Sequence, residues 1–386
     1  MRGTALAATL LLNLCPMLDL KAEPARNANL EPVPFNQLAG WGEDDHAAAF
    51  AVFRRSCEAI LNGAPALRAA SAPGAGLQRV CEAAVQQDLS RSRAAARRFF
   101  EAHFAPLEVQ PQLGRGFLTG YFEPEYDGSL TQSPDFPAPL LARPDDLVAV
   151  APGATLPGLD PQFQAARRSG AEWTPYPDRA AIETGALGDR AKPIAFVRDA
   201  VAAFVIQVQG SARLRLPDGG TLRVAYAGRN GLPYTSIGRI LVEEGHIALD
   251  DMNLERLTAW LRAQPDGGRA VMWRNRSFVF FRVADELAAE DGPIGGAGLP
   301  LTPGRSLAVD RTLWSYGLPF WLDGELPLAG GGGEPLRRVM IAQDTGTAIV
   351  GPARGDFFFG SGAEAGTRAG RLRHPVRFVV LSPKPR

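Results

Sequence analysis

The chain divides into a helical first part and a longer part made of short apolar runs. In the first part, apolar side chains recur at helical spacing over residues 46–61 and 76–100, and Pro65 and Pro73 interrupt the pattern between them. We predict helices over these two segments. After Gly116 the apolar residues gather instead in short runs between Gly and Pro, which is typical of strands. The predicted strands are residues 117–122, 204–209, 221–226, 278–283, 338–342 and 376–381.

Turn and helix signals complete the picture of a mainly β body. Residues 217–220, Pro-Asp-Gly-Gly, predict a hairpin turn, because Asp and Gly tolerate the positive φ of a tight connection. Helical periodicity returns at residues 236–244 and 252–263. Residues 134–192 show no period from which structure can be assigned.

The first 22 residues have the pattern of an export signal. Arg2 precedes an apolar run over residues 5–14, which is shorter than the roughly 20 residues that a membrane-spanning helix needs. Cys15 offers a site for lipid attachment, although Leu14 stands where such signals place a small residue. We therefore expect an exported, periplasmic protein, and outer-membrane anchoring through Cys15 stays open.

Composition points to a soluble chain of more than one domain. The 386 residues include 46% hydrophobic and 21% charged residues, and 41 Lys and Arg balance 41 Asp and Glu, so nucleic acid is not an expected partner. Cys57 and Cys81 lie in the two predicted helices. In an oxidising compartment they would form a disulfide, or else remain two buried thiols.

Three aspartates beside Gly-rich turns are the strongest chemical signal. The sequence lacks the motifs of zinc hydrolases, nucleotide-binding loops and serine hydrolases, and its four histidines are scattered, so no metal or cofactor is expected. Asp310, Asp344 and Asp356 lie within the C-terminal third. Three aromatic residues follow Asp356, and a carboxyl against aromatic walls has a raised pKa that suits acid catalysis. Asp356 is therefore the candidate acid.

Ordered sequence blocks from about residue 116 to 381 resemble the membrane-bound lytic transglycosylase A family. Residues 310–381 are similar to the C-terminal domain of that family, which is named for its three aspartates. The other similar blocks, in the same order, are residues 120–124, 204–211, 226–238 and 275–281.

The resemblance implies a division of the chain into a leader and three parts. It implies a double-psi β-barrel built from two separate segments, with glycan lying in a groove between this barrel and an inserted second β domain. The expected parts are a signal peptide (1–22), a helical N-terminal region (23–115), the barrel (116–135 and 270–386) and the insert (136–269).

The resemblance also implies an activity and a role for each aspartate. The family consists of peptidoglycan lytic exotransglycosylases, lyases that cleave the β-1,4 bond between N-acetylmuramic acid and N-acetylglucosamine and leave a 1,6-anhydromuramic end. Asp356 occupies the position of the catalytic aspartate, which acts first as acid and then as base. Asp344 and Asp310 occupy supporting positions. The partner would be the glycan strands of peptidoglycan, and we expect a monomer.

Polar and aromatic residues inside the similar blocks are candidates for holding the sugars. Amides and hydroxyls can bind sugar hydroxyl and N-acetyl groups, and tyrosine rings offer flat faces, although any one tyrosine could equally belong to the core. The candidates are Tyr121, Gln207, Gln209, Gly210, Ser211, Tyr226, Asn230 and Tyr234.

The chain departs from the family pattern at two positions, and two other functions remain open. Thr347 stands where Gly is common and Val350 where Lys is common, so any role of that Lys would pass to another basic residue such as Arg354. A hydrolase of the same barrel type would use water and leave a reducing end. A non-catalytic wall-binding protein would keep the groove but need no acid.

Overall fold

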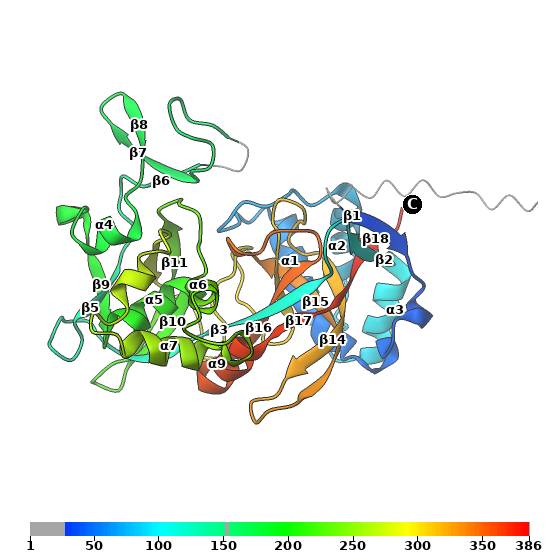
Figure 1. The fold of residues 1–386 in the computed structure, drawn as a ribbon. Helices are drawn as coiled ribbons and strands as arrows, with labels where there is room; N and C mark the ends of the chain where they lie inside the picture. The colour runs from blue at the N-terminus through cyan, green and yellow to red at the C-terminus, as the bar shows by residue number, and fades with distance from the viewer. Residues whose placement is uncertain (1–27, 151–153, 386) are drawn as a thin grey trace, which may run out of the picture.

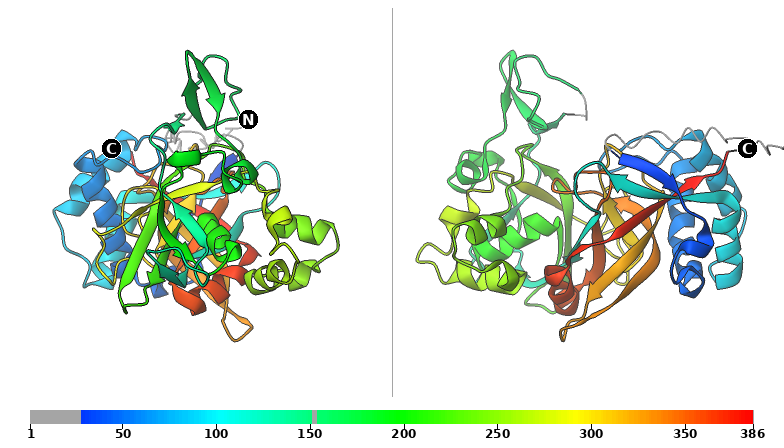
Figure 2. Two further views of the ribbon diagram at one scale, coloured as in Figure 1. Left: turned by 90° about the vertical axis from the view of Figure 1, so that its left-hand side faces the viewer. Right: turned by 45° about the vertical axis from the view of Figure 1, so that its right-hand side comes forward.

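Two separate β-sheets organise the computed structural model, which describes residues 28–150 and 154–385 (Figure 1). A nine-stranded sheet and the N-terminal helices form one half, and a six-stranded sheet with its own helices forms the other. A three-stranded sheet projects from the second half (Figure 2). The prediction of a mainly β chain is confirmed.

The predicted export signal and Cys15 lie outside the described residues. Within the two described ranges, no helix is both long and apolar enough to cross a bilayer.

Three N-terminal helices pack against one face of the nine-stranded sheet. They are α1 (His46–Leu61), α2 (Ala75–Val85) and α3 (Arg93–His103). The prediction of one helix over residues 76–100 is wrong, because a turn separates α2 from α3. In this turn the Asp88 carboxylate accepts a hydrogen bond from the Ser90 hydroxyl (2.6 Å), and Ser92 then caps α3. Cys57 and Cys81, both fully buried, form a disulfide that joins α1 to α2.

The nine-stranded sheet gathers strands from both ends of the chain. In spatial order the strands are β1 (Ala28–Pro32), β2 (Phe104–Pro111), β18 (Arg377–Pro383), β14 (Pro319–Pro327), β15 (Gly333–Asp344), β13 (Ser306–Val309), β16 (Arg354–Ser361), β3 (Phe117–Glu123) and β17 (Arg373–Pro375). The expectation that residues 23–115 are helical is therefore corrected, since β1 and β2 lie in this sheet and Leu107 and Val109 enter its core.

Helix α9 (Gly362–Arg371) covers β3 and β16 closely. A Cβ on Gly120 would lie 2.8 Å from the Ala369 Cα, so only glycine allows this approach. Through this contact α9 packs on β3, which pairs in parallel with β16.

The six-stranded sheet forms the core of the second half. Its strands, in spatial order, are β12 (Val279–Val283), β11 (Thr221–Arg229), β10 (Ser211–Arg215), β4 (Glu125–Ser129), β9 (Pro193–Val197) and β5 (Ala138–Leu141). The predicted turn at residues 217–220 joins β10 to β11. The expected boundaries of the insert at residues 136 and 269 are corrected. Strands β4 and β12 lie outside these boundaries in the sequence, yet both belong to the six-stranded sheet.

Residues 204–209 are helical, which contradicts the predicted strand. They end helix α5 (Ala200–Gln209), which Asp199 caps by accepting a hydrogen bond from the Ala202 amide (2.6 Å). Gly210 ends the helix at φ +85°. Because nearly the whole helix is buried, its residues are apolar on every side and the helical period that would reveal it is missing.

The remaining elements lie around the second half. The helices are α4 (Arg179–Glu183), α6 (Ile237–Glu243), α7 (Leu254–Arg262) and α8 (Arg269–Met272), and α6 and α7 match the predicted helices at residues 236–244 and 252–263. The projecting sheet is β6 (Val148–Ala149), β7 (Ala165–Ser169) and β8 (Glu172–Pro175). It occupies part of the segment for which the sequence showed no period.

A buried ionic cluster joins the two halves at the end of β3. The Glu123 carboxylate is 1% exposed and accepts hydrogen bonds from Arg213 Nε (2.7 Å) and Arg223 Nη2 (3.1 Å). Arg213 also donates to the carbonyls of Ala289 (2.9 Å) and Asp291 (2.8 Å), on the segment by which the chain returns to the first half. One cluster thus fixes both connections between the halves.

Candidate active site

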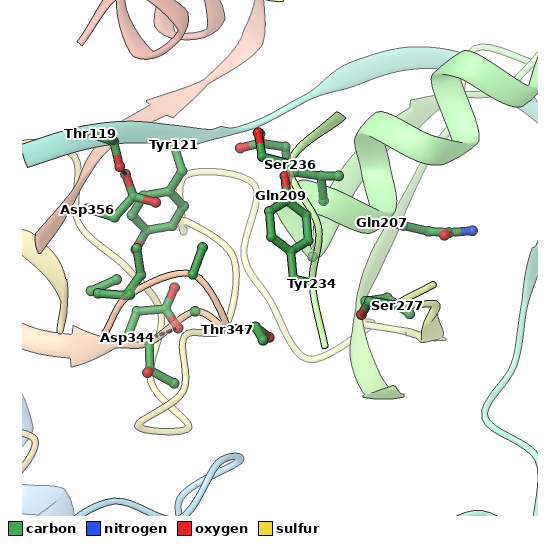
Figure 3. Close-up of a pocket in the computed structure, with 18 of the residues that line it drawn as sticks. Thr119, Tyr121, Gln207, Gln209, Tyr234, Ser236, Ser277, Asp344, Thr347 and Asp356 are labelled. Atoms are coloured by element: carbon green, nitrogen blue, oxygen red, sulfur yellow. Dashed lines mark hydrogen bonds between the residues drawn. The ribbon is translucent and has the colours of Figure 1, made fainter. Parts of the chain in front are cut away.

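A cavity of about 630 Å³ lies between the two halves, and both contribute its walls. Figure 3 shows Thr119 and Tyr121 of β3 with Asp356 of β16 and Asp344 on one side, and the end of α5 on the other. A loop that precedes α2 adds Arg68. The cavity therefore depends on segments that are far apart in the sequence.

Asp356 lies in this cavity as a carboxyl group with a strongly perturbed pKa. Burial raises its pKa to about 6, and the nearby Asp344 adds to the rise, whereas Arg354 and a hydrogen bond from Thr119 act against it. At pH 7 roughly a tenth of the molecules then carry a proton on Asp356, far more than for an exposed aspartate. The group can donate a proton near neutral pH and can accept one afterwards.

The aromatic residues after Asp356 contribute less than the sequence suggested. Side chains alternate between the faces of a strand, so Phe358 shares the face of Asp356 while Phe357 and Phe359 point the other way. Phe358 packs on Tyr121 with ring centroids 5.2 Å apart, and the rings of Phe357 and Phe359 pack on each other at 4.6 Å. The prediction that all three aromatics wall the acid is thus corrected, since only Phe358 lies on the same face of the strand as Asp356.

Thr119 connects Asp356 to Arg354 through a single hydroxyl. Its Oγ1 donates to Asp356 Oδ1 (2.6 Å) and accepts from Arg354 Nη2 (2.7 Å). The parallel pairing of β3 with β16 places Thr119 opposite Asp356. Burial lowers the pKa of Arg354, and Asp356 raises it. Arg354 therefore sets the orientation of the hydroxyl that holds the acid.

Asp344 ends β15 and holds two loops of the cavity wall. Its Oδ1 accepts hydrogen bonds from the amides of Gly296 (2.7 Å) and Thr345 (2.8 Å). Burial raises the pKa of Asp344, and Arg68 opposes this rise. Asp344 therefore shapes the site through backbone contacts and adds negative charge near Asp356.

Asp310 does not line this cavity. Its Oδ1 accepts from the amide (3.0 Å) and hydroxyl (2.7 Å) of Thr312, and its Oδ2 accepts from the Gly351 amide (2.8 Å). These contacts organise the loop that precedes β16. Of the three aspartates, the structure brings only Asp344 and Asp356 together.

Most of the predicted sugar-binding residues line the cavity. They are Tyr121, Gln207, Gln209, Gly210, Tyr226 and Tyr234. Within the described part of the chain, Gln207 Oε1 is buried without a hydrogen-bond partner, so a bound ligand could satisfy it. Burial, followed by the charges of Asp344 and Asp356, raises the pKa of Tyr121, which keeps its hydroxyl protonated.

Two of the predicted sugar-binding residues lie outside the cavity lining. Asn230 is fully buried and serves the backbone, since its Nδ2 donates to the carbonyls of Pro177 and Arg276 (both 2.9 Å) and its Oδ1 accepts from the Phe278 amide (2.9 Å). Ser211 is buried as the first residue of β10. Both were placed in the site only because they lie within blocks that resemble the family.

Several lining residues were not predicted from the sequence. Thr119 immediately precedes one of the similar blocks, and only strand pairing brings it to Asp356. The lining also includes Arg68, Arg229, Ser236, Ser277 and Thr345. The last four lie within blocks that resemble the family, but nothing in the sequence separates them from their neighbours there, whereas Arg68 lies outside the blocks and reaches the site through the packing of distant segments.

The residues that the structure describes contain no group of three or more His, Cys, Asp or Glu side chains placed to hold a metal ion.

Comparison with known proteins places this site in a defined class. Residues 117–282 match the MltA specific insert domain, and residues 305–382 match the 3D domain. The matches cover most of the six-stranded sheet and the part of the nine-stranded sheet that carries Asp344 and Asp356. The chain thus combines an MltA specific insert domain with a 3D domain.

Named relatives identify the family. The chain is 34% identical over 202 residues to membrane-bound lytic murein transglycosylase A of Vibrio cholerae and 35% identical over 216 residues to that of Escherichia coli. These matches cover 51% and 54% of this chain and 54% and 57% of those proteins, so the chain spans about half the length of the curated relatives it matches. The chain belongs to the membrane-bound lytic murein transglycosylase A family.

Solved structures agree over nearly the whole chain. The membrane-bound lytic murein transglycosylase from Agrobacterium tumefaciens superposes with a TM-score of 0.82 at 37% identity, covering 92% of this chain and 98% of that one. Escherichia coli MltA with bound chitohexaose gives a TM-score of 0.63 at 26% identity, covering 93% and 95%. The two-sheet arrangement is thus shared with these proteins.

Proposed function

We propose that the chain is a lytic transglycosylase that cleaves the β-1,4 bond between N-acetylmuramic acid and N-acetylglucosamine in peptidoglycan. The observation that carries the proposal is Asp356, a buried carboxyl with a pKa of about 6 in a groove that also holds the unpartnered amide oxygen of Gln207. Escherichia coli MltA binds chitohexaose. We place the glycan of the present chain in the corresponding groove between the two halves.

In the first step, protonated Asp356 acts as a general acid. It donates its proton to the glycosidic oxygen as the bond from that oxygen to C1 of the muramic acid breaks, and an oxocarbenium-like sugar forms. The departing N-acetylglucosamine leaves with the proton on its new hydroxyl group. The hydrogen bond from Thr119 holds the carboxyl in place.

In the second step, the Asp356 carboxylate acts as a base. It removes the proton from the 6-hydroxyl of the same muramic acid while that oxygen attacks C1, so a 1,6-anhydro ring forms and Asp356 regains its proton. No water is consumed. One carboxyl serves both steps because the nucleophile belongs to the substrate, and an intramolecular hydroxyl held in line has a high effective concentration.

The groups around Asp356 support these steps without exchanging protons with the substrate. Asp344 fixes the loops at Gly296 and Thr345. Its negative charge would favour the positive charge that develops on the sugar. Gln207 Oε1 would gain its missing partner from a sugar hydroxyl or N-acetyl group.

The proposal also covers the arrangement of domains, for which the resemblance to the family supplies the expectation. We propose that the nine-stranded sheet contains a double-psi β-barrel and that the six-stranded sheet is the inserted domain facing it. We also propose that the protein is exported to the periplasm, acts there as a monomer, and can associate with the outer membrane.

The test is digestion of purified sacculi with the wild-type chain and Asp356→Asn, with product masses as the readout. The wild type should release anhydromuropeptides and Asp356→Asn should release none. The matched control is Asp189→Asn, which removes an exposed carboxylate and should behave as the wild type.

Two results would contradict the proposal. Unchanged release of anhydro products by Asp356→Asn would remove Asp356 from the chemistry. Products heavier by one water would instead indicate a hydrolase, for which Asp344, in the same cavity, would be the second carboxylate.

A further inference from the structure

A second cavity of about 350 Å³ adjoins the groove. The two cavities share Arg68, Tyr226 and Arg229 as well as residues 345–347. The second cavity extends away from Asp356 toward the base of the projecting three-stranded sheet, where Ala149 lines it. A group attached to a sugar in the groove could therefore reach into this cavity.

Four arginines line the second cavity, and we call it the arginine pocket: Arg68, Arg143, Arg229 and Arg311. Across residues 28–150 and 154–385, none of the four has a carboxylate within the 4 Å of an ion pair, although many other arginines of the chain do. Four guanidinium groups thus line one cavity without an ion-pair partner in these ranges, and Asp310 is the acidic residue of that lining.

The two arginines shared with the groove are held by neutral groups. Arg68 Nη1 donates to the Thr345 carbonyl (2.7 Å), and its guanidinium lies 4.0 Å from the centre of the Tyr226 ring. Arg229 Nη1 donates to Thr347 Oγ1 (2.9 Å). Burial, with the charges of Arg68 and Arg311, lowers the pKa of Arg229 to about 10, so it stays charged near neutral pH.

The two arginines found only in the arginine pocket contact backbone carbonyls. Arg143 Nη2 donates to the Leu147 carbonyl (2.7 Å), and Arg311 Nη1 donates to the Ala69 carbonyl (2.5 Å). Each guanidinium has five N–H donors, so these contacts leave donors for a ligand.

The acidic residue of the lining, Asp310, forms no ion pair with the four arginines in the part of the chain that the structure describes, so its one negative charge offsets their four positive charges only in part. Both of its carboxylate oxygens are occupied by hydrogen bonds from Thr312 and Gly351. At position 350, where the family commonly has Lys, this chain has Val350, which is 71% exposed and also lines the pocket. The positive charge of the pocket therefore comes from other segments of the chain.

We propose that the arginine pocket binds a carboxylate attached to the muramic acid of the substrate. Planar guanidinium groups match carboxylates in geometry and charge, and peptidoglycan offers them beside the cleaved bond. With its peptide stem, muramic acid presents the stem carboxylates, and without the stem it presents the free lactyl carboxylate. The inference rests on the proposed function for the identity of the glycan.

The test measures binding in an Asp356→Asn background, so that no turnover is needed. Dissociation constants would be compared for soluble glycan chains with peptide stems, the same chains after amidase treatment, and chitohexaose, which has no carboxylate. The test variant is Arg143→Gln with Arg311→Gln, and a second variant has Lys at both positions. Arg91→Gln, an exposed arginine between α2 and α3, is the matched control.

We expect the Gln variant to bind at least one muramic acid glycan about tenfold more weakly or worse, because it loses charge-assisted hydrogen bonds. Chitohexaose binding should change less than about twofold, and the Lys variant should recover part of the loss. Loss confined to stem-bearing chains identifies the stem carboxylates, and loss confined to amidase-treated chains identifies the lactyl carboxylate.

Two outcomes would overturn the proposal. One is unchanged binding of both muramic acid glycans by the Gln variant. The other is an equal loss for chitohexaose, which would mean that the substitutions damage the groove. Failure of the proposed function would be seen separately, as a wild-type chain that releases no anhydro product.

Discussion

Asp356→Asn should make the protein more stable at neutral and alkaline pH although it removes the proposed catalytic acid. Burial is the chief cause that raises the Asp356 pKa from the ordinary aspartate value of 3.8 to about 6. Since one unit corresponds to about 1.36 kcal/mol, ionising Asp356 in the folded state costs up to about 3 kcal/mol of stability. Asparagine has no charge to bury and can still accept the Thr119 hydrogen bond.

The sign of the pH dependence follows from the raised pKa. Below pH 4 Asp356 is protonated in both the folded and unfolded states and costs nothing. As the pH rises from about 4 to about 6, the wild type loses stability, and above pH 6 the loss is complete. The stability of Asp356→Asn relative to the wild type should therefore increase by about 1 to 3 kcal/mol between pH 4 and pH 8.

The assay is equilibrium urea unfolding of both proteins at pH 4, 6 and 8, with the disulfide kept oxidised. Groups that do not interact with Asp356 titrate equally in both proteins, so they cancel in the difference. Asp189→Asn should show a flat difference across this range. A change below about 0.5 kcal/mol for Asp356→Asn, or a change of opposite sign, would refute the argument that burial raises the pKa of Asp356.

Three further substitutions test other parts of the structure. Thr119→Val removes a hydrogen bond that lowers the pKa of Asp356, so the fall in kcat/KM at alkaline pH should move up by about half to one pH unit, and a downward move would contradict this role. Glu123→Ala leaves two arginines without their buried partner and should cost about 3 to 5 kcal/mol in urea unfolding, whereas a loss below about 1 kcal/mol would show that the cluster is dispensable. Replacing Cys57 and Cys81 by Ser opens a link across 24 positions and should cost about 3 kcal/mol, and a reductant should destabilise the wild type but not this variant.

The sequence predicted those helices and strands whose pattern of apolar and polar residues matches the faces that are buried and exposed in the fold. Strands such as β11 and β18 carry apolar runs bounded by turn residues, and helix α1 has one apolar face, so their patterns are visible without a structure. Helix α5 is the counterexample, because burial on all sides removes the period that distinguishes a helix from a strand.

The sequence predicted those site residues that lie beside a recognisable local motif. Asp344 and Asp356 were found from their Gly-rich surroundings and the resemblance, and both line the groove. Thr119 and Arg68 could not be found, since strand register and loop packing, which no local pattern encodes, bring them there. Asn230 shows the opposite error, a polar residue inside a similar block whose hydrogen bonds all go to the backbone.

The cluster at Glu123 brings together the two connections between the halves, and this arrangement affects how the chain can evolve. Arg213 holds together the strand by which the chain leaves the first half and the segment, at Ala289 and Asp291, by which it returns. Because the two connecting segments lie side by side, the second half has the arrangement of a domain inserted at one point of the first half. A chimera that takes residues 124–288 from one relative and the rest from another would need to preserve Glu123 with its partners Arg213 and Arg223, together with contacts between the halves such as those between α7 and α9. The wall opposite Asp356 could then diversify while the wall that carries Asp356 stays the same.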